Sequence, residues 1–542
     1  MHDAVSLAPT GRERKLSKLI SRFTSSVRAQ APARVEVGLA ALSALLLILS
    51  FPNFNLWPLA WVGIVPLIIS VMRAPQLNWR ALLLGWIAGT IFFYGSCYWL
   101  TYSMVRYGHI PLVISYLLLL PATMIVGIFP ALFCVALARL VARFGAFAVV
   151  AAAPVWVACE WARLGVTGQL WNTVGYSQAY VPQLIQTASW GGVYAVGFLI
   201  VMTNAAIALL FLRRTKSAFL SSVLIILCVA LIIALSARTP PQMTSNKVEA
   251  TIIAIQPNVP MEPVESVAET EALMARHLSL SALALSELKD ASAPRVVIWP
   301  ESPMNFMYAR DFEFREMLAS FTKANHTSVI FNALEPAPAG GSYNSAVMVN
   351  EEGRLVAQYD KIRLLPFGEY VPLPRWLPGV NLIPVMVGDF TPGAQYPLLP
   401  LGGARGGIFI CFESAFPSIA RRFALDGADV LINISNDGYL GPTPVMRQHL
   451  ANTVFRAVEN NRPVLRVTNT GISAYITARG EVRDTTGGFQ TATRVWTVSR
   501  TAEGKTFYTK HGDLFVGACA ALSLLLIIGS KFKVGRLMNF EP

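Results

Sequence analysis

The chain has 542 residues, of which 54% are hydrophobic and only 14% charged, a composition that excludes an ordinary soluble protein of this length. Its net charge of +13 does not indicate nucleic-acid binding, because the basic residues gather at the edges of apolar stretches rather than on one face. Six cysteines occur without metal-ligand spacing, and only Cys411 lies outside the apolar stretches, so neither a metal site nor a disulfide partner for Cys411 is expected.

The N-terminal half alternates between a basic leader and long apolar runs. Residues 1–34 hold seven Lys or Arg and no short apolar core before a cleavage site, which predicts a cytoplasmic arm rather than a cleaved signal peptide. Residues 35–236 contain only two carboxylates, Glu36 and Glu160, and predict a transmembrane domain of seven helices. The expected spans are 35–52, 56–72, 81–101, 110–138, 146–162, 193–212 and 217–236.

The second half is expected to be soluble up to one last span. Residues 237–512 mix polar and charged residues without an apolar run long enough to cross a bilayer, which predicts a single soluble domain. Residues 513–542 would form an eighth transmembrane helix, at about 513–530, and a cytoplasmic tail.

The basic residues also predict the orientation. With the N-terminus inside, only Arg106 and Arg163 fall in the short outer loops, an asymmetry that places 237–512 on the periplasmic side of a bacterial inner membrane. Both termini would then be cytoplasmic. A lone cysteine kept in such an oxidising space favours a working thiol. The remaining basic residues at membrane edges fall inside: Arg73, Arg80, Arg139, Arg143, Arg213, Arg214, Lys216, Lys531, Lys533 and Arg536.

The outer loop 163–192 carries four aromatic residues, Trp171, Tyr176, Tyr180 and Trp190. They fit an aromatic belt at the membrane interface, or a platform on which the soluble domain meets lipid. Glu160 and Arg163, three residues apart at the outer end of the fifth span, fit a structural ion pair or a functional pair at membrane depth.

Strands and helices alternate along the soluble half. Strands are expected at 248–255, 295–299, 328–332, 430–435, 464–468, 473–477 and 493–497, with a meander over 346–359. Helices are expected at 267–288, near 417–425 and near 444–460. The pattern predicts a layered α/β domain with mixed sheets beside a polytopic α-helical membrane domain.

The strand that ends at Cys411 organises the soluble half. Gly406-Gly407-Ile408-Phe409-Ile410 reads as a buried strand. Ser414 and Pro417 then suggest a helix start, with Ser414 as the cap. The sulfur would face helix amide dipoles that favour the thiolate, unless Cys411 is simply a small buried hydrophobe.

Two charged residues stand in the same setting as Cys411. Glu301 follows the strand 296–299 and Lys361 follows the strand 356–360. Acyl transfer by a thiol needs the nucleophile, a base to take its proton, and a cation or amides to hold the oxyanion. Each charge alone fits a solvated side chain, but their shared place at strand ends favours a catalytic set. No Ser/His/Asp arrangement competes, and His449 is expected on a polar helix face.

Several motifs resemble one family as a set. They are Trp299-Pro300-Glu301-Ser302, Tyr359-Asp360-Lys361, Pro366-Phe367-Gly368-Glu369-Tyr370-Val371-Pro372, Ile410-Cys411-Phe412-Glu413, Ile434-Ser435-Asn436-Asp437, Arg456-Ala457-Val458-Glu459, Arg462-Pro463, Asn469-Thr470-Gly471, Glu160-Trp161 and Gly175-Tyr176-Ser177-Gln178. The chain is similar over nearly its whole length, except the N-terminal arm, to the apolipoprotein N-acyltransferase family, a membrane-anchored branch of the nitrilase superfamily.

The resemblance implies a fold and a set of roles. It implies an αββα nitrilase-type sandwich carried on eight helices. Cys411 would be the nucleophile, Glu301 the general base and Lys361 the oxyanion stabiliser. Their supporting residues would be Glu369, Glu413 and Phe412, and Tyr439, Glu160 and Trp171 would lie on the substrate path.

The implied reaction moves an acyl chain from a membrane phospholipid, through a Cys411 thioester, to the α-amine of a diacylglyceryl-cysteine on an apolipoprotein. No cofactor or metal is implied, and the partners are these two substrates and the membrane, with the enzyme a monomer. A membrane-anchored amidase that uses water as acceptor, and a catalytically silent envelope scaffold, are the alternatives.

Three sites depart from the family pattern. Phe412 stands where Tyr is frequent, Tyr439-Leu440 where Trp-Phe is frequent, and Met261-Glu262 where an aromatic residue is expected. They are expected to line the path of the acyl chain or peptide.

Overall fold

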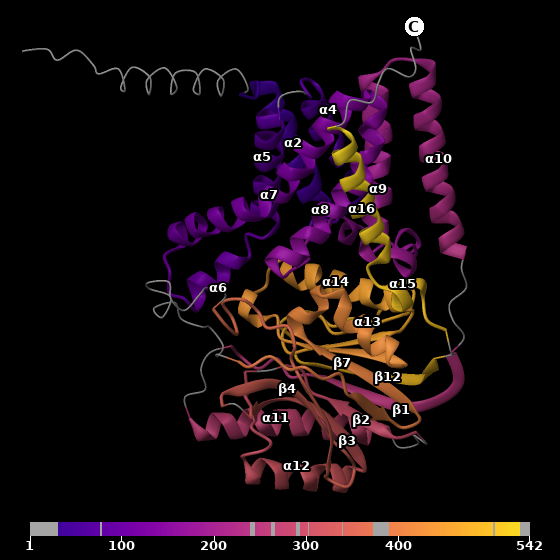
Figure 1. Cartoon of the computed structure of the whole chain (residues 1–542). Coiled ribbons are helices and arrows are strands. Elements are labelled where there is room, and N and C mark those ends of the chain that lie inside the picture. The colour runs from indigo at the N-terminus through magenta and orange to yellow at the C-terminus, as the bar shows by residue number, and fades with distance from the viewer. Residues whose placement is uncertain are drawn as a thin grey trace, which may run out of the picture.

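A computed structural model describes residues 31–75, 78–238, 244–261, 266–288, 293–301, 303–338, 340–371, 390–501 and 504–531. Most of the predicted basic arm, the end of the predicted tail, and Glu262 lie outside these described residues. A bundle of helices from the N-terminal half stands over a layered α/β domain, and the last helix returns into the bundle (Figure 1).

Apolar helices make up the bundle. They are α2 (Arg34–Ser50), α3 (Ala60–Gly63), α4 (Val65–Met72), α5 (Asn78–Ser96), α6 (Leu100–Arg106), α7 (Leu112–Phe144), α8 (Ala152–Thr167), α9 (Ala188–Leu212), α10 (Lys216–Arg238) and α16 (Leu514–Gly529). Among the described residues, four helical stretches are long and apolar enough to cross a membrane, or five if α5 and α6, bent by 55°, count as one. Two shorter apolar stretches, Trp57–Met72 and Leu514–Gly529, accompany them, and the predicted total of eight spans stays a prediction.

Two six-stranded sheets form the α/β domain. The first has the order β12-β1-β2-β3-β4-β5 and the second the order β11-β10-β9-β8-β7-β6. The first consists of β1 (Thr244–Gln256), β2 (Arg295–Ile298), β3 (Thr327–Pro336), β4 (Ser342–Val349), β5 (Leu355–Asp360) and β12 (Ala492–Thr501). The second consists of β6 (Leu398–Leu401), β7 (Ala404–Ile410), β8 (Val430–Ser435), β9 (Val464–Thr468), β10 (Ala474–Ile476) and β11 (Val482–Arg483). Each sheet has a parallel centre and antiparallel edges.

Alternation along the strands explains the layering. On β1, Ile253 and Ile255 pack in one core with residues of α11 (Val267–Ser286) and α12 (Phe312–Asn325). Ile252 and Ala254 point the other way, into the core shared with the second sheet. Successive side chains of a strand face opposite sides, so each strand serves two apolar layers. The αββα sandwich expected from the resemblance follows, although α12 was not among the helices predicted from sequence.

The second sheet carries its helices toward the membrane bundle. α13 (Pro417–Leu425) and α14 (Val445–Asn460) lie between this sheet and the apolar helices (Figure 1). Of the 16 residues of α14, 14 are buried, so the polar face on which His449 was expected is enclosed within the protein. A helix that is buried all round is enclosed by other elements, here the sheet on one side and the bundle on the other.

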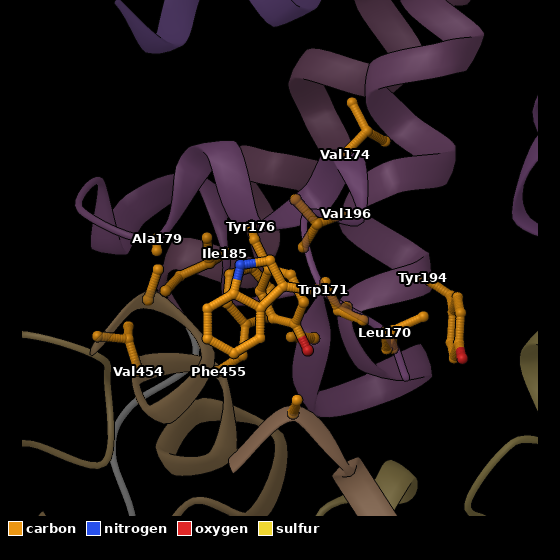
Figure 2. Close-up of a cluster of buried hydrophobic side chains, with 14 of the residues drawn as sticks. Leu170, Trp171, Val174, Tyr176, Ala179, Ile185, Tyr194, Val196, Val454 and Phe455 are labelled. Atoms are coloured by element: carbon orange, nitrogen blue, oxygen red, sulfur yellow. The ribbon is translucent and has the colours of Figure 1, made fainter. Parts of the chain in front are cut away.

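The loop between α8 and α9 makes much of this contact. Trp171 and Tyr176 are buried and gather with Val454 and Phe455 of α14, as Figure 2 shows. The Tyr176 and Phe455 rings meet edge to face with centroids 5.1 Å apart. Neither predicted role, interfacial belt or lipid platform, describes these two side chains, because they bind the α/β domain instead. Of the four aromatic residues, Trp190, in the first turn of α9, is 61% exposed, and its ring stacks on Phe507.

Candidate active site

Cys411 stands at the end of β7, where the chain turns into a short 3₁₀ helix, Cys411–Ala415. Its φ is +49°, in the left-handed region that costs a non-glycine residue about 1–3 kcal/mol. The predicted cap is wrong: α13 begins after Phe416, with Pro417 at its first position, and among the described residues the Ser414 hydroxyl has no hydrogen-bond partner. Pro417 is where the sequence placed it, and Gly407 is needed because a Cβ there would collide with Phe423 of α13.

Charged side chains from the first sheet meet at this point. Lys361 follows β5, is 1% exposed, and its Nζ lies 2.8 Å from Glu369 Oε1 and 3.4 Å from Glu301 Oε1. The Glu301 carboxylate, which follows β2, also accepts from the backbone N–H of Asn436 at 3.2 Å. Asn436 follows β8 of the second sheet, so Glu301 spans the two sheets.

Asn344, which sequence reasoning did not identify, holds the two carboxylates together. Its Nδ2 donates to Glu301 Oε1 at 3.0 Å and to Glu369 Oε1 at 2.8 Å. The backbone carbonyl of Asn344 accepts from the backbone N–H of Lys361 at 2.8 Å. The residue opens β4 beside the end of β5, so strand register rather than sequence spacing puts it here.

Glu413 ties the turn Cys411–Ala415, called here the nucleophile turn, to the backbone just after Lys361. It is fully buried and accepts from the backbone N–H of Ile362 at 2.8 Å, that of Ile410 at 2.8 Å, and the Tyr359 hydroxyl at 2.8 Å. One carboxylate thus binds strand β7 and the end of β5. Burial raises the pKa of Glu413, while these donors act in the opposite direction.

Electrostatics set the resting state of the thiol. Burial and the Glu301 carboxylate raise the pKa of Cys411 above its usual range, although Lys361 acts in the opposite direction. The predicted preference for the thiolate is therefore wrong for the resting site. Burial alone would lower the pKa of Lys361, but Glu301 and Glu369 raise it, so the ammonium keeps its charge. A protonated thiol beside a carboxylate and a fixed cation must lose its proton before it can attack.

His449 is a further residue that the sequence did not assign. Its Nε2 donates to the carbonyl of Cys411 at 2.9 Å, and its Nδ1 lies 2.8 Å from Asp437 Oδ1. Asp437 pairs with Arg466 at 2.9 Å. Burial alone would raise the pKa of Asp437, yet Arg466 and His449 lower it to about 2. The sequence contained one hint of this network: Asp437 follows β8, the strand that pairs with the Cys411 strand β7.

The remaining predicted residues surround this centre at different distances. The Trp171 ring stacks on Phe412 with centroids 6.1 Å apart. Burial and the Glu301 carboxylate raise the pKa of Tyr439, which follows Asn436, the residue whose backbone N–H donates to Glu301. Its ring meets Tyr107 of the helical bundle at 5.6 Å.

Glu160 is set apart from these residues, within the helical bundle. One of its oxygens accepts from the backbone N–H of Val174, and the other, Oε2, has no hydrogen bond to any residue that the structure describes. Arg163 donates to Thr173 and to the Trp171 carbonyl instead, so the expected ion pair between the two is not formed. Both residues line an apolar pocket with Phe51, Phe92, Phe93, Phe129 and Phe133.

Comparison with known proteins now identifies the chain. The family model described as apolipoprotein N-acyltransferase N-terminal domain matches residues 43–206, and the one described as carbon-nitrogen hydrolase matches residues 251–503. The apolipoprotein N-acyltransferase of Geobacter metallireducens is 33% identical over 495 residues, which cover 89% of this chain and 93% of that protein. The chain belongs to the apolipoprotein N-acyltransferase family.

Two further apolipoprotein N-acyltransferases agree. Those of Allorhizobium ampelinum and Rhizobium meliloti are 31% and 30% identical and cover 77% and 81% of this chain. The matched stretches cover 81% and 85% of those two proteins. An amidase from Nesterenkonia sp., at 18% identity, aligns with 52% of this chain and 99% of its own, with a TM-score of 0.37. At that score the assignment rests on the family models and relatives, which confirm the resemblance carried by the motifs.

Proposed function

We propose that the chain transfers an acyl group from a membrane phospholipid to the α-amine of a diacylglyceryl-cysteine at the start of an apolipoprotein. Family membership supports the class of reaction. The observation that carries the chemistry is the meeting of Glu301 and Lys361, from one sheet, with Cys411, from the other. A base, a fixed cation and a thiol are the set that acyl transfer requires.

The first half-reaction forms a thioester. Glu301 takes the proton of the Cys411 thiol, and the sulfur attacks the carbonyl carbon of a phospholipid ester. Lys361 stabilises the negative charge that develops on the carbonyl oxygen. The ester C–O bond then breaks, Glu301 returns the proton to the leaving oxygen, and a lysophospholipid departs.

The second half-reaction consumes the thioester. The α-amine of the lipoprotein cysteine attacks the same carbonyl carbon while Glu301 takes a proton from the nitrogen. The C–S bond breaks, the amide forms, and the sulfur regains a proton. Glu369 and Asn344 hold Glu301 and Lys361 in place, and Glu413 holds the Cys411 turn against them.

The membrane bundle serves this chemistry by confining both substrates to one plane. Two substrates held in the same bilayer reach a far higher effective concentration than they would in solution. We place the α/β domain on the periplasmic side of the inner membrane, with both termini cytoplasmic, because basic residues favour the opposite ends of the helices. The proposed unit of catalysis is a monomer. A cysteine introduced at exposed Glu351 should react with a membrane-impermeant maleimide in intact spheroplasts. Labelling only after lysis would reverse the orientation.

The acyl-enzyme can be observed directly. Purified protein incubated with phosphatidylethanolamine should gain the mass of one acyl chain, and peptide mass spectrometry should locate it on Cys411. Cys411→Ala should gain none, and Cys228→Ala, which removes an exposed cysteine of α10, is the matched control. An adduct on any other residue, or none on the wild type, would contradict the proposal.

A further inference from the structure

Gln448, in the first turn of α14, uses every hydrogen-bonding position of its side chain. Its Oε1 accepts from Trp171 Nε1 at 2.9 Å and from Trp99 Nε1 at 3.1 Å. Its Nε2 donates to the carbonyls of Pro52 and Ser96, both at 3.1 Å. A side-chain amide offers two donors and one acceptor oxygen, so this one is fully satisfied.

These partners come from three separate parts of the helical bundle. Pro52 follows α2, Ser96 ends α5, with Trp99 just beyond it, and Trp171 follows α8. A single buried side chain of the α/β domain therefore joins three segments that lie far apart in sequence. Bonds of this kind are strong in a low-dielectric interior, and their loss leaves buried polar groups unpaired.

The next residue, His449, faces the nucleophile instead. Neighbouring residues on a helix do not share a face, so Gln448 can hold the bundle while His449 holds the Cys411 carbonyl. Trp171 contacts both regions: its ring centroid lies 5.7 Å from that of His449, and the ring stacks on Phe412. The nucleophile turn is thus linked to the bundle both through α14 and through the indole.

We infer that Gln448 is a positioning residue through which the membrane bundle sets the place of the Cys411 thiol. Cys411 occupies a left-handed conformation, which persists only where its surroundings hold it. A nucleophile displaced by about 1 Å can lose up to about 100-fold in rate. The inference deepens the proposed function and rests on it for its substrate.

The test variant is Gln448→Met, which keeps the length of the side chain and removes its hydrogen bonds. Gln186→Met is the matched control. Gln186 is also a buried glutamine that links the bundle to the α/β domain, through the Arg479 carbonyl at 3.0 Å, but its side chain hydrogen-bonds to no described residue of α14 or of the nucleophile turn. Trp171→Phe is a milder second variant that keeps a ring beside Phe412 and removes the bond to Gln448.

Two rates at Cys411 are measured on full-length protein that passes size exclusion as a single species. One is single-turnover acylation by phosphatidylethanolamine. The other is alkylation by iodoacetamide, which needs no lipid site and is located on Cys411 by peptide mass spectrometry. We expect Gln448→Met to acylate roughly 10–100-fold more slowly than Gln186→Met and to be alkylated more slowly, because Glu301 no longer reaches a displaced thiol.

Two outcomes decide against the inference. Equal rates for Gln448→Met and Gln186→Met would overturn it. Slower acylation with unchanged alkylation would also overturn it, since that pattern reports lost lipid binding. If Gln448→Met does not fold, acylation and alkylation of Trp171→Phe at the wild-type rates would overturn the inference. Failure of the wild type to form an acyl adduct would refute the proposed function, and the alkylation rates would still decide the role of Gln448.

Discussion

The two sheets of the α/β domain differ in what covers them and in what they supply. The first sheet contributes Glu301 and Lys361, and its outer helices α11 and α12 lie on the side away from the membrane bundle (Figure 1). The second contributes Cys411, and its outer helix α14 is enclosed by the bundle. The charges therefore come from the layer remote from lipid, and the nucleophile comes from the layer that the membrane helices hold.

This division gives the bundle a role beyond anchoring. α11 buries four of its 20 residues and α14 buries 14 of its 16, so the two outer layers are built for different surroundings. One of the two helix layers faces the bundle. Substitutions of Glu301 and Lys361 in the first sheet test the charges, and substitutions of Cys411 in the second sheet test the nucleophile.

Substitution of Cys411, the residue that the second sheet contributes, should have the largest effect on acyl transfer. Cys411→Ala should abolish both thioester formation and N-acylation, because a methyl group cannot attack a carbonyl. Cys411→Ser should fold and lose nearly all turnover, since its hydroxyl is a weaker nucleophile that needs a stronger base. Product formation is followed by the mass of an N-acylated diacylglyceryl peptide. Substantial product from Cys411→Ala would remove the nucleophile assignment.

Loss of the base from the first sheet should come next. Glu301→Gln keeps the shape of the side chain and cannot take the thiol proton, so acylation of Cys411 should slow by about 10²–10⁴. The rate is measured by intact-protein mass in a single turnover. Glu369→Gln is the comparison variant. It removes a carboxylate of the same cluster, but Glu369 transfers no proton in the proposed reaction. Wild-type acylation in Glu301→Gln would show that another group is the base.

Loss of the cation should slow both half-reactions by a similar factor. Lys361→Met removes the charge that meets the oxyanion, and removal of one such stabiliser costs about 10²–10³ in rate. Lys361→Arg should restore little, because a planar guanidinium does not reproduce the compact ammonium between Glu301 and Glu369. Formation and decay of the thioester are timed separately. A variant that slows neither step would leave the oxyanion to backbone amides alone.

The smallest effect should follow from His449, which acts on the backbone of the nucleophile. His449→Leu removes the donor to the Cys411 carbonyl and should slow acylation about tenfold, whereas His449→Gln can place an amide N–H near the same carbonyl and should recover part of the rate. Melting temperatures of the two variants control for folding. Equal acylation rates for Leu and Gln would assign His449 to stability alone.

Sequence reasoning located the catalytic candidates because each follows an expected strand, and the strands before Glu301 and Cys411 are strongly apolar. β8, β9 and α13 have the predicted bounds for the same reason: their periodicity is clear and their ends carry Pro, Gly or polar residues. The residues it did not assign, Asn344, Gln448 and His449, act across elements. Asn344 depends on strand register, and the other two depend on a helix whose polar side chains suggested water but are satisfied by buried partners.

The roles of Trp171 and Tyr176 were also beyond the sequence. An aromatic loop between two apolar spans fits a membrane interface, and nothing in its composition says that a second domain covers it. Only the packing of the loop shows this, through the contact of Tyr176 with Phe455 of α14 (Figure 2) and through that of Trp171 with Phe412.

The most direct test of the proposed chemistry is the fate of an isolated acyl-enzyme. Protein carrying one acyl group on Cys411, freed of phospholipid, is mixed with a diacylglyceryl-cysteine peptide that has a free α-amine, and with an α-N-acetylated peptide as control. We predict that the protein loses the acyl mass at the rate at which the N-acylated peptide appears, and that the acetylated peptide leaves the thioester intact. Release of free fatty acid at the same rate with either peptide would contradict the proposal and make the chain a hydrolase.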